Sequence, residues 1–303
     1  MSTAAAPNPS RPAPPNPYLS HLDIVIGYDH GQTISQVKAS TATEWGVTLD
    51  EIIDDSYANL RALPTPTWEP LGDALWKLES EGGYTESFLQ LPKIFDQFPA
   101  QGTPLVMIPN RGVLLATGAD EPDGLTALLK LARQSIEHAP WPLCGDLFRV
   151  AQSGVELYTP DGPTETLLAG IQKIDIASVY AAQKAALEAH CAAINDDVFV
   201  ATYGLLGKKD APDDLQSWCS WTEGVPTLLP TTDCIAFVWN LHSARKTALV
   251  PWADAERLVG HYFKPTAEDP PRTRVDVFPT QPERTELEKA AALAASPPPS
   301  PAI

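Results

Sequence analysis

Apolar positions along the chain alternate between helical and strand periods, and one order of elements occurs twice. In the first stretch, Thr48-Leu-Asp-Glu51 predicts a capped helix start, because the Thr hydroxyl and the Glu carboxylate can each accept a backbone N–H from the other residue. Trp45 precedes this helix and is placed to pack against it. Apolar runs at 105–109 and 113–117 flank Asn110-Arg111-Gly112 and predict a hairpin.

Two further elements complete the first stretch. Residues 84–91 alternate imperfectly between apolar and polar side chains and predict a strand. Residues 123–139 predict a helix, because apolar side chains recur there at helical spacing. The side chains expected on its inner face are Leu125, Leu128, Leu129, Ala132 and Ile136.

The second stretch repeats this order between residues 176 and 263. It predicts a helix, two strands, a hairpin and a final helix, at 176–194, 198–203, 217–222, 234–239 with 247–250, and 252–263. Because hairpins outnumber crossovers, we expect an α+β fold with two similar lobes, each a small, mainly antiparallel sheet packed by helices. An internal duplication would explain the repeated order.

Prolines crowd the two ends of the chain, where large apolar side chains are few. Such segments bury too little surface to offset the entropy of ordering. We therefore expect a disordered tail over 1–17, an N-terminal lobe over 18–165, a C-terminal lobe over 166–282, and a disordered or frayed helical tail over 283–303.

Charge narrows the classes of partner. The chain has 21 Lys and Arg against 38 Asp and Glu, a formal net charge of -17 at pH 7. A surface this acidic is repelled by phosphate backbones and anionic lipids, and no run of basic residues offsets it. We therefore expect a protein partner, and neither a nucleic acid nor a membrane.

The cysteines and the N-terminus indicate a cytoplasmic protein. No basic start followed by an apolar core marks a secretory signal, and no window approaches the roughly 18 apolar residues of a membrane span. Cys144, Cys191, Cys219 and Cys234 lie far apart among apolar neighbours, without paired-ligand spacing. They predict reduced, buried thiols and no metal site or cofactor.

Four residues are candidates for binding a ligand or a partner. Trp218 and Trp221 bracket a dense aromatic segment that is either core or partner surface. Asp233 either caps the turn after Pro230 or points into a pocket. Arg111, at the predicted hairpin tip, is either a surface turn residue or a ligand clamp.

Catalytic constellations are scarce in this sequence. Cys219 with His242 is the only nucleophile and base worth considering, and a core cysteine with a loop histidine is the competing interpretation. The sequence therefore names no catalytic residue.

Several segments resemble the YtpQ-like family of bacterial proteins over roughly residues 43–135. They are Trp45-Gly-Val-Thr-Leu-Asp-Glu51 ending in Ala58-Asn-Leu60, Tyr84-Thr-Glu-Ser-Phe-Leu-Gln-Leu-Pro92, Gly102-Thr-Pro-Leu-Val106 and Ile108-Pro-Asn-Arg-Gly-Val-Leu-Leu115. The chain departs from the family pattern at Glu86, where a small residue is usual, and at Gly112, where an acid is usual. The resemblance implies a cytoplasmic bacterial protein and a fold, without a mechanism.

Taken together, these patterns predict a non-catalytic interaction or regulatory protein. The alternative is a small-ligand-binding or hydrolase-like enzyme with a site near Asp233 and Cys219. Clustering of these residues with a histidine in one cleft would favour the enzyme. An apolar surface patch over Trp218 and Trp221 would favour the protein partner.

Overall fold

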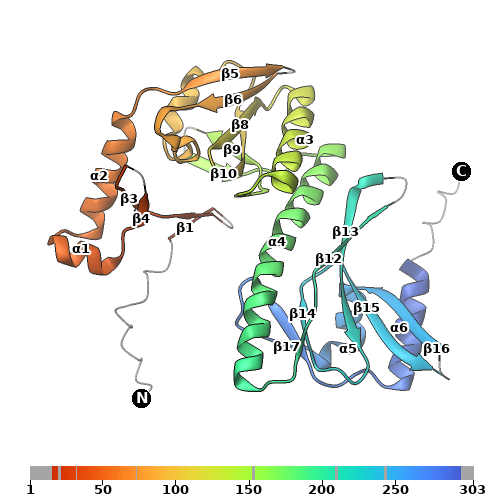
Figure 1. Cartoon of the computed structure of the whole chain (residues 1–303). Helices are drawn as coiled ribbons and strands as arrows, with labels where there is room; N and C mark the ends of the chain where they lie inside the picture. The colour runs from red at the N-terminus through yellow and green to blue at the C-terminus, as the bar shows by residue number, and fades with distance from the viewer. Residues whose placement is uncertain are drawn as a thin grey trace, which may run out of the picture. The chain divides into compact units, whose positions relative to one another are not determined.

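The computed structural model describes residues 16–19, 22–31, 33–72, 74–151, 154–208, 211–241 and 244–294. The chain divides into two compact units, residues 1–168 and 169–303. Helices pack with several mostly antiparallel sheets, so the predicted α+β class is confirmed (Figure 1). Of the tails expected over 1–17 and 283–303, residues 1–15 and 295–303 lie outside the described residues. The expectation is wrong for Asn16 and Pro17, which belong to a strand because they pair with the backbone of residues 23–24.

The first unit begins with two small antiparallel sheets and two helices. Their bounds are β1 Asn16–Leu19, β2 Leu22–Ile24, β3 Gly27–Asp29, β4 Ile34–Gln36, α1 Ala39–Trp45 and α2 Leu49–Ala62. Gly46 ends α1 at φ 69°, a left-handed conformation that glycine adopts without strain. The predicted capping box of Thr48 and Glu51 is present at the start of α2.

A six-stranded antiparallel sheet follows, in the order β10-β9-β7-β8-β6-β5. Its strands are β5 Thr67–Gly72, β6 Leu75–Glu79, β7 Pro104–Asn110, β8 Val113–Gly118, β9 Phe148–Ala151 and β10 Gly154–Leu157. The β7–β8 hairpin is the predicted one. Helix α3, Pro122–His138, packs on this sheet and buries all five side chains expected on its inner face.

Residues 84–91 form no strand. They lie in the 3-10 helix η2, Thr85–Gln90, between η1, Glu81–Gly83, and η3, Pro92–Gln97. Phe88 and Leu89 are adjacent and both buried. A strand points neighbouring side chains to opposite faces, whereas a helical turn brings both to the core. The expected strand is therefore wrong.

The second unit contains most of α4, Pro163–Ile194, and two four-stranded sheets in the orders β12-β13-β15-β16 and β11-β14-β18-β17. The strands are β11 Phe199–Val200, β12 Gly204–Lys208, β13 Ala211–Thr222, β14 Thr227–Pro230, β15 Cys234–Leu241, β16 Ala244–Pro251, β17 Lys264–Pro265 and β18 Arg272–Val275. The remaining helices are α5 Trp252–Val259, η4 Gly260–Tyr262 and α6 Gln281–Ala294.

The two units do not share a sheet architecture. The large sheet of the first unit is antiparallel throughout, whereas the second unit contains two parallel pairs, β13 with β15 and β11 with β14. The repeated order of predicted elements therefore does not correspond to a repeated strand order, and the structure does not show the expected duplication.

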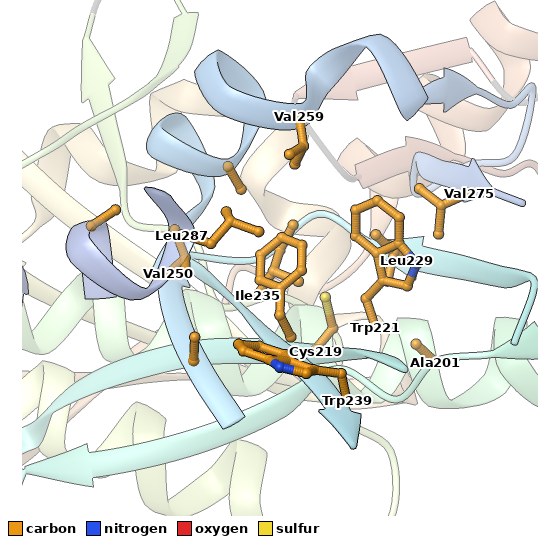
Figure 2. Packing of buried hydrophobic residues seen from close by; sticks show 14 residues of the cluster. Ala201, Cys219, Trp221, Leu229, Ile235, Trp239, Val250, Val259, Val275 and Leu287 are labelled. Carbon is orange, nitrogen blue, oxygen red and sulfur yellow. The ribbon is translucent and has the colours of Figure 1, made fainter. Parts of the chain in front are cut away.

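The core of the second unit is built around Trp221. Its indole is 1 % exposed, and it lies beside Leu229 and Val275 in Figure 2. The rings of Phe237, Phe278 and Phe263 lie 5.2, 5.6 and 6.0 Å from it, between centroids. Aromatic rings bury more apolar surface than other side chains. Trp221 is thus the centre of this core and offers no surface to a partner.

Arg272 is the largest buried polar side chain of the second unit, 1 % exposed. Its Nη1 donates to the carbonyl oxygens of Ala201 at 2.9 Å and Leu228 at 3.1 Å, and its Nε donates to Gln183 Oε1 at 2.6 Å. Burial lowers the pKa of the guanidinium. The guanidinium of Arg272, on β18, thus binds β14, α4 and the residue after β11. These bonds fix the relative positions of the four segments.

Helix α6 corrects the expectation of a frayed tail. It lies against β16 and α5, with Leu287 0 % exposed and Ala290 buried in the core of Figure 2. The side chains of Thr280 and Glu283 bond at its start, and Lys246 pairs with Glu288 at 2.8 Å. Leu287 and Ala290 are enough to dock α6, because both lie on the side of the helix that is buried in the core.

We predict that Trp221→Ala lowers the free energy of unfolding by about 3–5 kcal/mol, because it empties the centre of a packed core. Urea unfolding followed by circular dichroism measures this loss. Trp218→Ala is the matched control, since that indole is 37 % exposed, and its loss should stay below about 2 kcal/mol. Equal losses for the two variants would contradict the assignment of Trp221 as the core centre.

We also predict that Leu287→Ala costs about 2–5 kcal/mol of stability, because α6 is docked through this side chain. Leu293→Ala, on the same helix and 76 % exposed, should change stability by less than about 0.5 kcal/mol. Melting curves of the two variants test this. A frayed α6 would make both changes neutral.

Candidate functional site

Asp233 lies between β14 and β15 and joins two elements that are distant in sequence. Its Oδ2 accepts the Ser217 N–H at 2.7 Å and the ammonium of Lys173, on α4, at 2.7 Å. In return the Asp233 N–H donates to Ser217 Oγ at 2.8 Å. Lys173 also donates to the Leu215 carbonyl at 2.8 Å. The carboxylate therefore ties α4 and β13 to the start of β15.

The charge state of Asp233 follows from these contacts. Burial opposes the carboxylate form, but the hydrogen bonds from Lys173 and Ser217 outweigh it and lower the pKa of Asp233. A carboxylate held ionised by a lysine and a backbone N–H is a poor general base at neutral pH. Asp233 therefore fits neither interpretation from the sequence. It is not a cap of its own turn or a free carboxylate in a pocket, because its partners come from β13 and α4.

Cys219 lacks the properties of a nucleophile. It is 0 % exposed, and burial raises the pKa of its thiol to about 12. Thr232 Oγ1 lies 3.4 Å from its sulfur. His242, the base proposed for it, lies outside the described residues. Across the described ranges, His, Cys, Asp and Glu form no group of three or more that could hold a metal ion.

Trp218 and Trp221 lie on opposite faces of β13. Trp221 faces the core and is therefore wrong as a surface candidate, whereas Trp218 is 37 % exposed. The Trp218 indole covers Gly204 on β12, where an added Cβ would lie 2.7 Å from Trp218 Nε1. The apolar patch over both tryptophans that would have favoured a protein partner does not form, because alternate residues of a strand point to opposite faces.

Arg111 occupies the turn between β7 and β8 and lines a cavity of about 450 Å³ with Asp29 and Tyr84. The Tyr84 hydroxyl and the Gly31 N–H both donate to the Asp29 carboxylate, and these bonds lower the pKa of Asp29. Arg111 is thus both a turn residue and a cavity residue. The carboxylate that lines the cavity with it, Asp29, already accepts hydrogen bonds from Tyr84 and Gly31.

The two departures from the YtpQ-like pattern contact each other beside this cavity. The Gly112 N–H donates to Glu86 Oε2 at 3.0 Å. Glu86 lies on η2. A carboxylate from η2 therefore accepts a hydrogen bond from the backbone of the β7–β8 turn.

Sequence reasoning did not find a pair of exposed aromatic rings that contact each other in the first unit. Tyr28 and Trp45 are 49 % and 48 % exposed, and their ring centroids lie 5.6 Å apart. The His30 ring lies 4.8 Å from Tyr28, and its Nε2 bonds Ser35 Oγ at 2.9 Å. We call Tyr28, His30 and Trp45 the aromatic surface. They line a cavity of about 410 Å³ together with Ser35, Gln36, Val37 and Thr41.

The position of Trp45 explains why the sequence pattern missed this surface. Trp45 is the last residue of α1 and contacts the ring of Tyr28 on β3, whereas we expected it to pack against the following helix. A lone Trp among polar residues signals exposure, but only the fold brings it to a second ring.

Exposed acidic side chains are frequent on α1, which ends in Trp45, and on α2, which follows it. They are Glu44, Asp50, Glu51, Asp54 and Asp55, against Lys38 and Arg61 as the basic residues of this stretch. An excess of carboxylates on these helices together with exposed rings favours a ligand that is both apolar and cationic.

No family model matches the chain, and neither a curated protein nor a solved structure is detectably similar to it. The YtpQ-like resemblance therefore stays a prediction from the motifs. No helix in the described part of the chain combines the length and the apolar character that crossing a bilayer requires.

We predict that Asp233→Asn lowers the free energy of unfolding by about 1 kcal/mol or less, because the amide oxygen still accepts the Ser217 N–H and the lost ion pair is partly exposed. Chemical unfolding measures the change, with Asp254→Asn on α5 as a surface control. An esterase, phosphatase or peptidase activity that vanished in Asp233→Asn at unchanged stability would identify a catalytic carboxylate instead.

Proposed function

We propose that the protein is a non-catalytic binding protein that recognises an extended polypeptide segment through the aromatic surface of its first unit. The observation that carries this proposal is the pair of half-exposed rings, Tyr28 and Trp45, beside a cavity of about 410 Å³. Tyr and Trp dominate binding energy at protein interfaces, since each offers a large apolar face and a polar group.

The polar side chains around the cavity suit a peptide backbone. Ser35, Gln36 and His30 carry donors and acceptors at its wall, and all three are exposed. An extended chain presents unpaired carbonyl oxygens that such groups can bind, while its side chains rest on the rings. The aromatic surface thus combines apolar contact with hydrogen bonding.

Charge supports a basic segment over a second copy of this chain. The carboxylates of α1 and α2 attract a Lys or Arg side chain, and an arginine also stacks on indole faces. A second chain with a net charge of -17 is repelled over the range of the screening length.

The alternative of a hydrolase near Asp233 and Cys219 is weakened by the chemistry of both groups. The thiol is buried and protonated, and the carboxylate is held by Lys173. A cytoplasmic location belongs to the proposal and is supported by the four cysteines, which are free and buried.

A displayed library of random peptides, selected on the full chain, tests the proposal. We expect the selected peptides to be rich in proline or apolar residues and to carry arginine or lysine. The double change Tyr28→Ala and Trp45→Ala should weaken their binding at least ~10-fold, because each ring is a hot-spot contact.

Trp141→Ala provides the matched control, since this indole is 66 % exposed in the same unit but lies outside the aromatic surface. Its binding should stay within about two-fold of the wild type. Peptides that bind the double variant as well as the wild type would show that the aromatic surface is not the binding site.

A further inference from the structure

The chain itself carries a segment with the chemistry that the aromatic surface favours. Residues 1–15 read Met-Ser-Thr-Ala-Ala-Ala-Pro-Asn-Pro-Ser-Arg-Pro-Ala-Pro-Pro, and Arg11 is their one charged side chain. Prolines at this density favour the polyproline II conformation, which aromatic-lined grooves bind at low entropic cost. The positive charge of Arg11 is complementary to the carboxylates of α1 and α2.

Strand pairing holds the start of β1, where residues 1–15 end, next to a residue that lies only a few positions before Tyr28. Asn16 pairs with Ile24 in the β1–β2 sheet, and Ile24 precedes Tyr28 by four residues. Four residues span at most about 14 Å of extended chain. Fifteen residues of polyproline II would reach about 45 Å at ~3.1 Å per residue, so the segment is long enough to fold back onto the surface.

The proline-rich segment at the other end lacks these features. Pro297, Pro298 and Pro299 have no arginine or lysine among the residues that follow α6, and they belong to the second unit. They share the proline content of residues 1–15 without the positive charge. This makes them an internal control.

We infer that residues 1–15 are an intramolecular ligand of the aromatic surface and compete there with the partner polypeptide. This inference rests on the proposed function and adds its regulation: the chain shields its own binding site until a stronger ligand displaces the segment. Prolines would lie on the rings of Tyr28 and Trp45, and Arg11 would pair with the carboxylates of α1 and α2, Glu44 among them.

The probe is a fluorescein-labelled synthetic peptide of residues 1–15, titrated against full-length proteins by fluorescence anisotropy. The proteins are the wild type, a variant with Arg11→Glu, Pro12→Ala and Pro14→Ala, and a control with Pro297→Ala, Pro298→Ala and Pro299→Ala. A short tether gives an effective concentration of about 1 mM. If the free surface binds the peptide with a Kd of about 0.1 mM, the wild type binds it roughly 10-fold more weakly than the first variant.

The expected pattern is therefore specific. The first variant binds the labelled peptide about 10-fold more tightly than the wild type, the control binds it like the wild type, and adding Tyr28→Ala with Trp45→Ala removes the binding. Circular dichroism and melting curves of every variant separate a loss of binding from a loss of folding.

Three results would overturn the inference. Equal binding by the wild type and the first variant excludes competition in the same chain. A concentration-dependent dimer that only the first variant loses assigns the segment to a second copy. If library peptides bind the aromatic surface but the 1–15 peptide does not, the proposed function stands and its self-regulation is excluded. If neither kind of peptide binds, both the proposed function and its self-regulation are excluded.

Discussion

The second unit depends on how it satisfies one buried cation. Arg272 lies at the first residue of β18 and points into the interior, and its hydrogen bonds within the described part of the chain go to backbone and amide carbonyl oxygens. A guanidinium offers five donors in a fixed plane, so the acceptors must come to it in a set arrangement. The backbone carbonyl oxygens belong to Ala201, Leu228 and Tyr180, and the side chain of Gln183, which like Tyr180 lies on α4, also accepts. An uncompensated buried charge is costly, and this requirement fixes where the helix and the two strands meet.

The polar residues near the suspected enzyme site also hold elements of the second unit together. Asp233, Lys173 and Ser217 connect β13, β15 and α4 through bonds of 2.7–2.8 Å, and Thr232 contacts the buried thiol of Cys219. Lys173 and Ser217 lower the pKa of Asp233, and burial raises the pKa of the Cys219 thiol. Perturbed pKa values mark functional sites in many proteins, but structural networks perturb them as well. Here the partners are backbone groups and neighbouring elements, and the geometry favours structure over catalysis.

The binding that we propose rests instead on large rings that the chain leaves exposed. The aromatic surface exposes two large rings that contact each other without closing into a core. The carboxylates of α1 and α2 would favour a basic ligand there. The binding function that we propose for this surface needs no catalytic set.

Local chemistry alone determined several parts of this protein. The capping box of Thr48 and Glu51, the inner face of α3 and the β7–β8 hairpin depend on residues close in sequence, so their patterns could be interpreted without the fold. Other features depend on contacts between distant segments. The helical turn at Phe88 and Leu89, the docking of Leu287, the role of Asp233 and the meeting of Tyr28 with Trp45 were decided by tertiary structure, because their partners are brought together only when the chain folds. Periodicity shows which side of an element is apolar, but it does not show which surface that side will meet.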